Sequence, residues 1–206
     1  ATTRDQLNYL RFPLGGLPKS ETRALANELG LRVAEKPDSQ DICFVPNGKY
    51  QDIVQKLRPG AIEPGQIVHV DGRVMGEHNG IINFTVGQRR GLGIATGEPL
   101  FVVKLDAPNK RVIVGARENL GVTRIALKEV NWIGEAVASE DELNGRDVLV
   151  RVRSTRPPVP AKLCIGAGWH VLLDAPEEGV APGQAAVFYD PHSTRVLGGG
   201  WIMATE

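Results

Sequence analysis

The chain has 206 residues with 24 basic and 24 acidic side chains, so its formal net charge at pH 7 is zero, and 42% of its residues are hydrophobic. This balance excludes an overall electrostatic attraction to nucleic acid, and any basic binding site must be local. No segment approaches the roughly 18 apolar residues that a membrane-spanning helix requires. Two distant cysteines do not make a disulfide framework. These features predict a protein of the reducing cytoplasm with no membrane partner.

The first quarter of the chain has a helical and looped pattern. Thr2 or Thr3 is expected to cap a first helix, and Ser20 a second helix that ends at Gly30. The segment "LRVAEK" predicts a short strand. A third helix is expected from about Lys49 to Leu57, where Pro-Gly breaks the pattern.

From Gly60 on, the pattern is that of short β-strands separated by Gly, Pro, Asn and Asp. Asp71-Gly72 marks the turn of one hairpin, and Ala107 to Lys110 connects a second one. Such a pattern is typical of a barrel or a sandwich, and a boundary near residue 126 separates a central module from a C-terminal one. Further strands are predicted in "RIALKEVNWIG", "RDVLVRVRS", "AKLCIGAG", "WHVLLDA", "QAAVFYD" and "RVLGGGWIMA".

The two cysteines have different surroundings. Cys164 lies between Leu and Ile in a predicted strand, where a buried apolar filler is expected. Cys43 follows the acids Asp38 and Asp41, which disfavour a thiolate, so a reactive Cys43 needs an activator elsewhere or a more acidic sulfur species. No metal site is expected, because no second Cys and no His stands at ligand spacing from Cys43. The four histidines are expected at the surface or in turns: His69, His78, His170 and His192.

Two arginine-bearing segments are candidate anion sites. In "FTVGQRRGLGI", Gln88, Arg89 and Arg90 stand among glycines, which fits either a tight β-loop or an anion-contacting loop. In "RDVLVRVRS", a period of two places Arg151 and Arg153 on the face opposite Val148, Val150 and Val152, which fits either a solvated edge or a phosphate-binding patch; Arg156 extends this row.

Six spaced motifs resemble bacterial tRNA-specific 2-thiouridylases in content and order, and the resemblance covers essentially the whole chain. The motifs are "DSQDICFVPNGKY", "RPGAIEPGQIV", "DGRVMGEHNGI", "FTVGQRRGLGI", "PLFVVKLD" and "APGQAAVFYD…VLGGGWI".

The resemblance implies a mostly β fold with a short α/β N-terminal segment. Residues 1–58 would be the remainder of a pyrophosphatase-loop catalytic domain, 59–126 a central β domain, and 127–206 an antiparallel β-barrel that binds tRNA. The family's Ser-Gly-Gly-x-Asp-Ser loop, which binds ATP and Mg²⁺, and its first catalytic Asp and Cys correspond to sequence upstream of Ala1. The chain is therefore expected to be the C-terminal part of the enzyme and to be inactive alone.

The implied reaction is thiolation of the wobble uridine at position 34. ATP would adenylate the C2 oxygen, and Cys43 would carry the sulfur as a persulfide received from a sulfur-relay donor protein. The upstream cysteine would resolve the exchange by forming a disulfide with Cys43. Arg151, Val152 and Gln184 match tRNA-contact positions of the family, and Arg153 joins them through the strand argument. Two other classes stay open: an RNA-binding β module without catalysis, and an unrelated thiol enzyme that uses Cys43 and a His.

Overall fold

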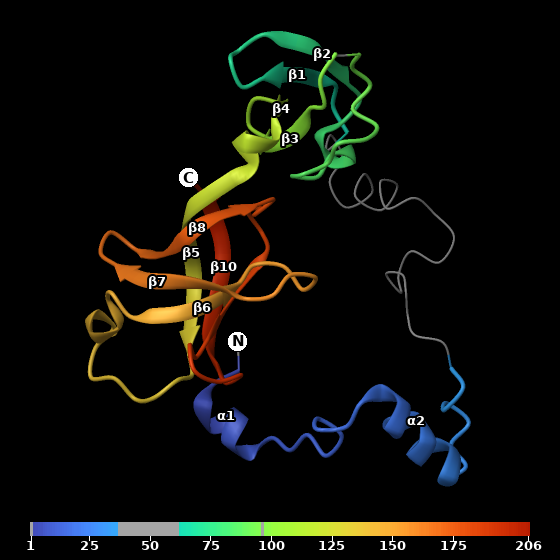
Figure 1. Ribbon diagram of the computed structural model, residues 1–206, viewed down its shortest axis with the longest axis vertical. Coiled ribbons are helices and arrows are strands. Elements are labelled where there is room, and N and C mark those ends of the chain that lie inside the picture. Colours follow the sequence, from blue (N-terminus) through green and yellow to red (C-terminus); the bar gives the residue numbers. More distant parts are fainter. Residues whose placement is uncertain (1, 37–61, 96) are drawn as a thin grey trace.

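The computed structural model describes residues 2–36, 62–95 and 97–206. Cys43, the expected third helix and the boundary at residue 58 lie outside these ranges. In Figure 1 the C-terminal β domain lies between the central β domain, above it, and the extended N-terminal segment, below it. None of the helices described is long and apolar enough to cross a membrane.

The N-terminal segment holds α1 (Arg4–Tyr9) and α2 (Lys19–Glu28). Thr3 caps α1 as predicted, because its hydroxyl accepts the main-chain N–H of Gln6. The prediction for Ser20 is wrong: α2 begins after Pro18 without a side-chain cap, so Ser20 lies inside the helix. Residues 31–36, expected as a strand, form a turn.

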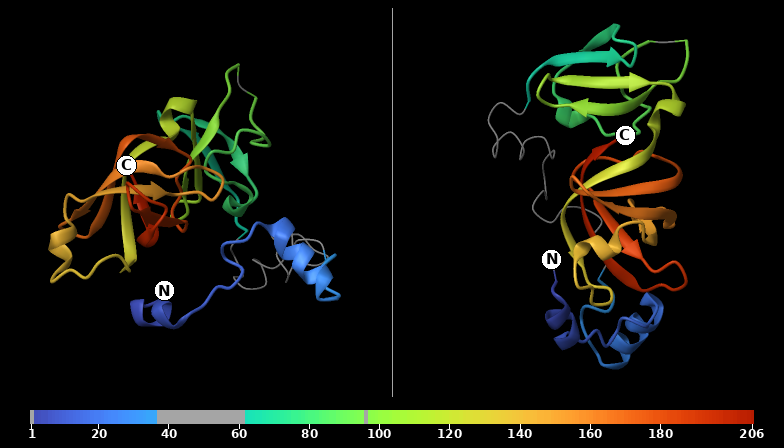
Figure 2. Two further views of the ribbon diagram at one scale, coloured as in Figure 1. Left: turned by 60° about the horizontal axis from the view of Figure 1, so that its bottom comes forward. Right: turned by 90° about the vertical axis from the view of Figure 1, so that its left-hand side faces the viewer.

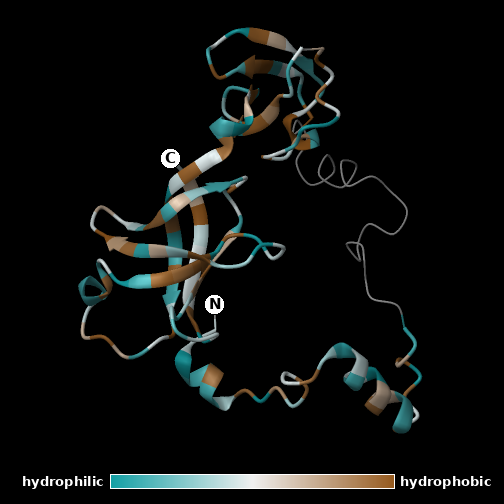
Figure 3. Ribbon diagram, viewed as in Figure 1, coloured by the Kyte–Doolittle hydropathy of each residue, from teal (hydrophilic) through white to brown (hydrophobic). Residues whose placement is uncertain are grey.

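The apolar side chains of this segment have little to pack on. Neither α1 nor α2 contains a buried residue. Tyr9, Phe12 and Leu29 are 85%, 67% and 72% exposed, and apolar positions recur along the whole segment (Figure 3). Burial of apolar surface is the main stabilising term in folding, so this segment lacks a core of its own.

The central domain is a four-stranded sheet with the order β2-β1-β4-β3. Its strands are β1 (Gly65–His69), β2 (Val74–His78), β3 (Phe101–Asp106) and β4 (Arg111–Gly115), and η1 (Ile81–Asn83) follows β2. The two predicted hairpins are present, and β1 lies parallel to β4 between them. The sheet packs around Ile67, Val102, Val112 and Val114, each fully buried.

His78 differs from its expected place at the surface. Its ring is buried, with 5% exposed, and Nδ1 accepts the main-chain N–H of Gly80 at 3.0 Å. Nε2 lies 3.2 Å from the carbonyl oxygen of Lys110, so it carries the proton and donates. The imidazole is therefore a structural link between β2 and the β3–β4 connection.

Asp71, in the β1–β2 turn, provides a pH-dependent prediction. Its carboxylate accepts the main-chain N–H of Arg73 at 3.0 Å, and this bond, with that to His69, lowers the pKa of Asp71 from 3.8 to about 2. A lowered folded-state pKa adds stability above the unfolded value, and this stability is lost as pH falls through the folded value. We expect Asp71→Asn to destabilise the hairpin at pH 6 and to have no effect below pH of about 2. Carbon-13 NMR titration of the Asp71 carboxyl checks the cause, and a midpoint near 3.8 would contradict it.

The C-terminal domain is a closed barrel with the strand order β10-β5-β8-β7-β6-β9, in which every neighbouring pair is antiparallel. The predicted barrel is thus confirmed over a sandwich. Phe188, Leu163, Val171 and Val150 are fully buried inside it. The strands are β5 (Gly121–Trp132), β6 (Asp147–Arg151), β7 (Val159–Ile165), β8 (Trp169–Glu178), β9 (Ala185–Tyr189) and β10 (Val196–Thr205), with η3 (Glu140–Leu143) before β6.

Strand β5 leads directly from the central domain into the barrel (Figures 1 and 2). It follows η2 (Arg117–Leu120) without a linker and pairs with β8 from Gly121 onward. Residue 126, where a soft boundary was expected, lies inside this strand. At the other end of the barrel, Asn131 Nδ2 donates to the carbonyl oxygen of Thr2 at 2.9 Å, which joins the segment before α1 to β5.

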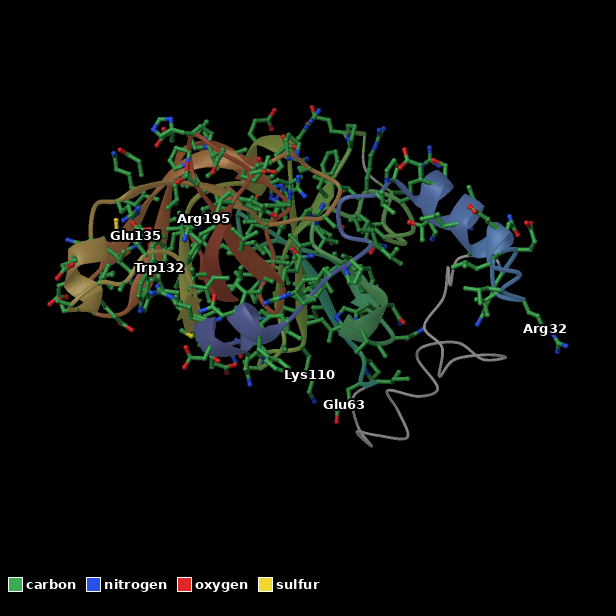
Figure 4. The ribbon with its side chains drawn as sticks, turned by 90° about the horizontal axis from the view of Figure 1, so that it is seen from below. Arg32, Glu63, Lys110, Trp132, Glu135 and Arg195 are labelled. Atoms are coloured by element: carbon green, nitrogen blue, oxygen red, sulfur yellow. The ribbon has the colours of Figure 1, made fainter. Side chains whose placement is uncertain are left out.

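Ion pairs hold the ends of both β domains. Lys110 Nζ contacts the carboxylate of Glu63, which fixes the β3–β4 connection to the segment before β1. In the barrel, Arg146 pairs with Glu135, and its guanidinium lies 5.2 Å from the ring centre of Trp132. Figure 4 shows Lys110 beside Glu63, and Glu135 close to Trp132. Each of these basic side chains is paired with a nearby acid, so we assign the two ion pairs a structural role.

Candidate nucleic-acid interface

A groove on the barrel surface brings the predicted barrel residues together. It has a volume of about 450 Å³ and lies where β6 pairs with β9, with Arg151 opposite Val187. The pairing and the turn before β9 place residues about thirty positions apart in sequence side by side. The groove is lined by Arg151, Val152, Arg153, Ser154, Gln184, Ala185, Val187 and Tyr189.

Arg151 is the last residue of β6, and its side chain is half-buried. Its guanidinium carbon lies 5.7 Å from the ring centre of Tyr189, which stands diagonal to it on β9. The ring holds the guanidinium along one wall of the groove. Arg151 Nε is buried without a hydrogen-bond partner among the described residues.

Gln184 occupies the turn that enters β9. Its main chain is fixed at both ends: its N–H donates to the carbonyl oxygen of Ala181, and its carbonyl oxygen accepts from Ile202 N–H at 2.8 Å. The side-chain oxygen Oε1 is buried and accepts no hydrogen bond from the part of the chain described. The amide oxygen is therefore an unpaired acceptor that is covered in this conformation, in a residue that lines the same groove as Arg151.

Arg153 lies two residues beyond the end of β6, because the strand stops at Arg151 and a bend follows. The strand was expected to continue through Arg153. Instead, Arg153 Nη2 donates to the carbonyl oxygen of Val86 in the central domain at 3.2 Å. Its Nε, like that of Arg151, is buried with no partner within the described ranges. Arg153 thus joins the two β domains as well as lining the groove.

These groups form a mixed donor and acceptor set. Guanidinium N–H groups donate to phosphate oxygens, and an amide oxygen accepts from a hydroxyl or a base N–H. A buried donor or acceptor left unpaired costs about 1–3 kcal/mol. Because the Nε and Oε1 atoms are covered, a ligand gains that energy only when these side chains turn to expose them. RNA offers both kinds of partner, phosphates and 2′-hydroxyls, along one strand.

The glycine-rich loop of the central domain is mainly braced by its own residues. Gln88 Oε1 accepts from Thr85 N–H at 3.0 Å, and its Nε2 donates to the carbonyl oxygen of Arg90 at 2.9 Å. Gly87 has a φ of +88°, as the tight-loop interpretation requires. Gln88 is therefore occupied in the loop, whereas the side chains of Arg89 and Arg90 are exposed.

Comparison with known proteins identifies the architecture. Three family models cover nearly all of the chain: a tRNA methyl transferase HUP domain matches residues 1–47, a tRNA methyl transferase PRC-barrel domain 51–116, and an aminomethyltransferase beta-barrel domain 122–202. The tRNA-specific 2-thiouridylases MnmA of Hyphomonas neptunium and Maricaulis maris are each 62% identical to it, over 98% and 100% of the chain. That of Parvibaculum lavamentivorans is 59% identical over 100% of the chain.

The chain belongs to the tRNA-specific 2-thiouridylase family. It spans about half the length of the curated relatives it matches, with 52% and 50% of the first two covered. The resemblance found in the sequence motifs is thereby confirmed, as is the mostly β fold.

The structure describes one of the two cysteines. Cys43 lies outside the described residues. Cys164 is on β7 opposite His170, and it is half-buried rather than fully buried as expected. Its neighbour Leu163 points into the barrel, so the alternation of the strand turns Cys164 toward the outer face.

Two further expectations are modified by the side-chain positions. Val152 is 5% exposed and packs in the barrel core, so it can offer a ligand only its main chain. Arg156 does not extend a free basic row, because Nη1 binds Glu177 Oε1 at 2.6 Å. Tyr189 was missed as a groove residue, although the alternation of "AAVFY" around the buried Phe188 already turns it outward.

The histidines form no cluster. His69 Nδ1 lies 2.9 Å from Asp71 Oδ1 in the first hairpin turn, and His170 Nδ1 lies 2.9 Å from the carbonyl oxygen of Gly168. Across the described ranges, no three His, Cys, Asp or Glu side chains come together as a metal site.

Proposed function

We propose that the chain contributes the tRNA-holding β domains and the sulfur-bearing cysteine of a tRNA sulfurtransferase that thiolates C2 of the wobble uridine, position 34. The groove carries this proposal, because it gathers Arg151, Arg153 and Gln184 with unpartnered donors and an unpartnered acceptor. A family whose relatives are named tRNA-specific 2-thiouridylases supports RNA as the ligand. A tRNA substrate also favours the cytoplasm as the place of action.

The exposed apolar side chains of the N-terminal segment support a catalytic domain larger than residues 1–58. Tyr9, Phe12 and Leu29 would be buried by further protein of the same domain. The match of residues 1–47 to a HUP domain model agrees with this division. We therefore propose a central domain followed by a tRNA-binding barrel, with the boundary moved from residue 126 to about residue 121, where β5 begins, and we expect the chain to be inactive alone.

ATP and Mg²⁺ would be bound outside the described residues. Those residues do not fit a nucleotide site of this family, because no Ser-Gly-Gly-x-Asp-Ser loop occurs in the chain and the glycine-rich loop at Gln88 is braced internally. The expected contribution of ATP is to make the C2 oxygen of the uridine a leaving group.

Cys43 would supply the sulfur. In this proposal, a donor protein leaves Cys43 with a terminal persulfide sulfur, which bonds to C2 as the activated oxygen departs. A second cysteine thiolate then attacks the Cys43 sulfur, so the sulfur–sulfur bond breaks, the sulfur stays on C2, and a disulfide forms. A persulfide is more acidic than a thiol, which offsets the unfavourable acids Asp38 and Asp41.

The alternative is a non-catalytic RNA-binding β module, which the groove favours equally. The distinguishing experiment incubates the full-length protein or this chain with unmodified tRNA, ATP, Mg²⁺ and a persulfide donor, and then measures 2-thiouridine by mass spectrometry of digested tRNA. We expect 2-thiouridine only with the full-length protein and only with ATP, while both proteins bind tRNA. Thiolation by this chain alone, or none by the full-length protein, would contradict the proposal.

A further inference from the structure

A second, smaller hollow lies where the central domain meets the barrel. Its volume is about 260 Å³. Four of its lining side chains are arginines, and one is an acid. The lining residues come from the glycine-rich loop, β3, η2, the bend after β6, and the end of β8: Gly87, Arg89, Phe101, Arg117, Leu120, Arg153, Arg156, Glu178 and Gly179.

The acids at the hollow fix two of these arginines without cancelling its charge. Arg117 binds Glu178 through Nε at 2.9 Å and Nη2 at 3.2 Å, and Arg156 binds Glu177 at 2.6 Å. The hydrogen bonds from Arg117 lower the pKa of Glu178, so this carboxylate stays ionised at neutral pH. Glu118 also lies close enough to Arg117 to raise its pKa, so four guanidinium groups face three carboxylates and one positive charge is in excess.

Arg89 and Arg153 are the two lining arginines whose charge is not paired. Neither is in an ion pair with a described acid. Arg153 is held in place by its bond to Val86 and by Gly179, where an added Cβ would come within 2.9 Å of Arg153 Nη2. A guanidinium fixed in advance loses less entropy when it binds an anion.

Arg153 also lines the groove described above, so the two hollows share one wall. A ligand with anionic groups repeated along its length can therefore contact Arg151 in the groove, pass Arg153, and reach Arg89 in the hollow. A polynucleotide backbone has this form, whereas a single small anion can fill only one of the two places.

We propose that the hollow formed by Arg89, Arg117, Arg153 and Arg156 is a second phosphate site, which binds a backbone phosphate of the RNA that occupies the groove. This inference rests on the proposed function in taking RNA as the ligand. It assigns Arg89 and Arg117 a binding role that the barrel groove alone does not require. A contact of this kind positions the RNA without reading its sequence.

The test measures tRNA binding by the full-length protein across a salt series. Loss of one neutralised phosphate lowers the slope of log affinity against log salt by about 0.7 to 0.9, and we expect this decrease for Arg89→Ala. Glu178→Gln releases Arg117 and should change the slope and the affinity in the opposite direction. Arg111→Ala is the matched control, because it removes an exposed arginine from β4, outside both hollows. Melting curves confirm that each variant is folded.

The outcomes separate the two proposals. No tRNA binding by the wild-type protein would overturn the proposed function itself. Normal wild-type binding with an unchanged slope in both Arg89→Ala and Glu178→Gln would overturn only the second phosphate site. Calorimetric titration with inorganic phosphate distinguishes the source of the phosphate: phosphate binding that requires Arg89, with no effect of Arg89→Ala on the RNA slope, would contradict RNA as the occupant.

Discussion

Under the proposed function, Cys43→Ser in the full-length protein is expected to abolish 2-thiouridine formation, with a loss on the order of 10³-fold or more, as for enzymes that lose their nucleophile. A serine hydroxyl cannot carry a transferable sulfur, so no other group in the segment compensates. Binding of tRNA should persist, because the candidate RNA contacts lie in the barrel at Arg151 and Gln184. Mass spectrometry of digested tRNA measures the product, and filter binding measures the complex.

Cys164→Ser is the matched control, since it is the other cysteine of the chain. Cys164 is half-buried on β7 in the barrel, and we expect thiolation to continue when it is replaced. Thiolation that survives in Cys43→Ser but is lost in Cys164→Ser would reverse the assignment of the sulfur carrier.

Arg151→Ala is expected to weaken tRNA binding by about 10-fold or more, since hydrogen bonds to charged groups contribute about 1.5–3 kcal/mol. The salt slope should fall by about 0.7 to 0.9, the loss of one phosphate contact. Gln184→Ala should lower the affinity and leave the slope unchanged, because a neutral amide releases no counterion. Filter binding across a salt series measures both quantities.

Two further variants serve as comparisons for Arg151→Ala. Arg124→Ala removes an exposed arginine from β5, away from the groove, and should change neither affinity nor slope appreciably. Arg153→Ala should also lower the melting temperature, because it removes the bond from Nη2 to Val86. An unchanged slope in Arg151→Ala would favour the solvated-edge interpretation of β6.

The β-strands were predictable because their local patterns agree with the final packing. In β6 the predicted alternation of Val148 and Val150 with Leu149 and Arg151 is present, since one face fills the barrel core.

The helix caps were less predictable than the strands. Ser20 is a good N-cap residue, but the helix already begins after Pro18, whose fixed φ suits a helix start.

The groove was predictable only in part. Arg151 and Gln184 were reached through motif resemblance, but their proximity depends on the pairing of β6 with β9, which no local pattern specifies. Arg153 was expected to continue a strand row, and its contact with Val86 could not be foreseen because the two residues are 67 positions apart. The hollow beyond it also depends on how the central domain meets the barrel.

RNA is proposed to bind in the groove over the β6–β9 pair. Nitrogen-15 NMR of the arginine Nε–H groups tests it most directly, because Arg151 Nε and Arg153 Nε have no hydrogen-bond partner among the described residues. Adding the anticodon stem-loop of the substrate tRNA to the chain should shift both signals with one saturable profile, and Gln184→Ala should weaken that profile. Saturable RNA binding that leaves the Arg151 and Arg153 signals unmoved would show that RNA binds elsewhere on the protein.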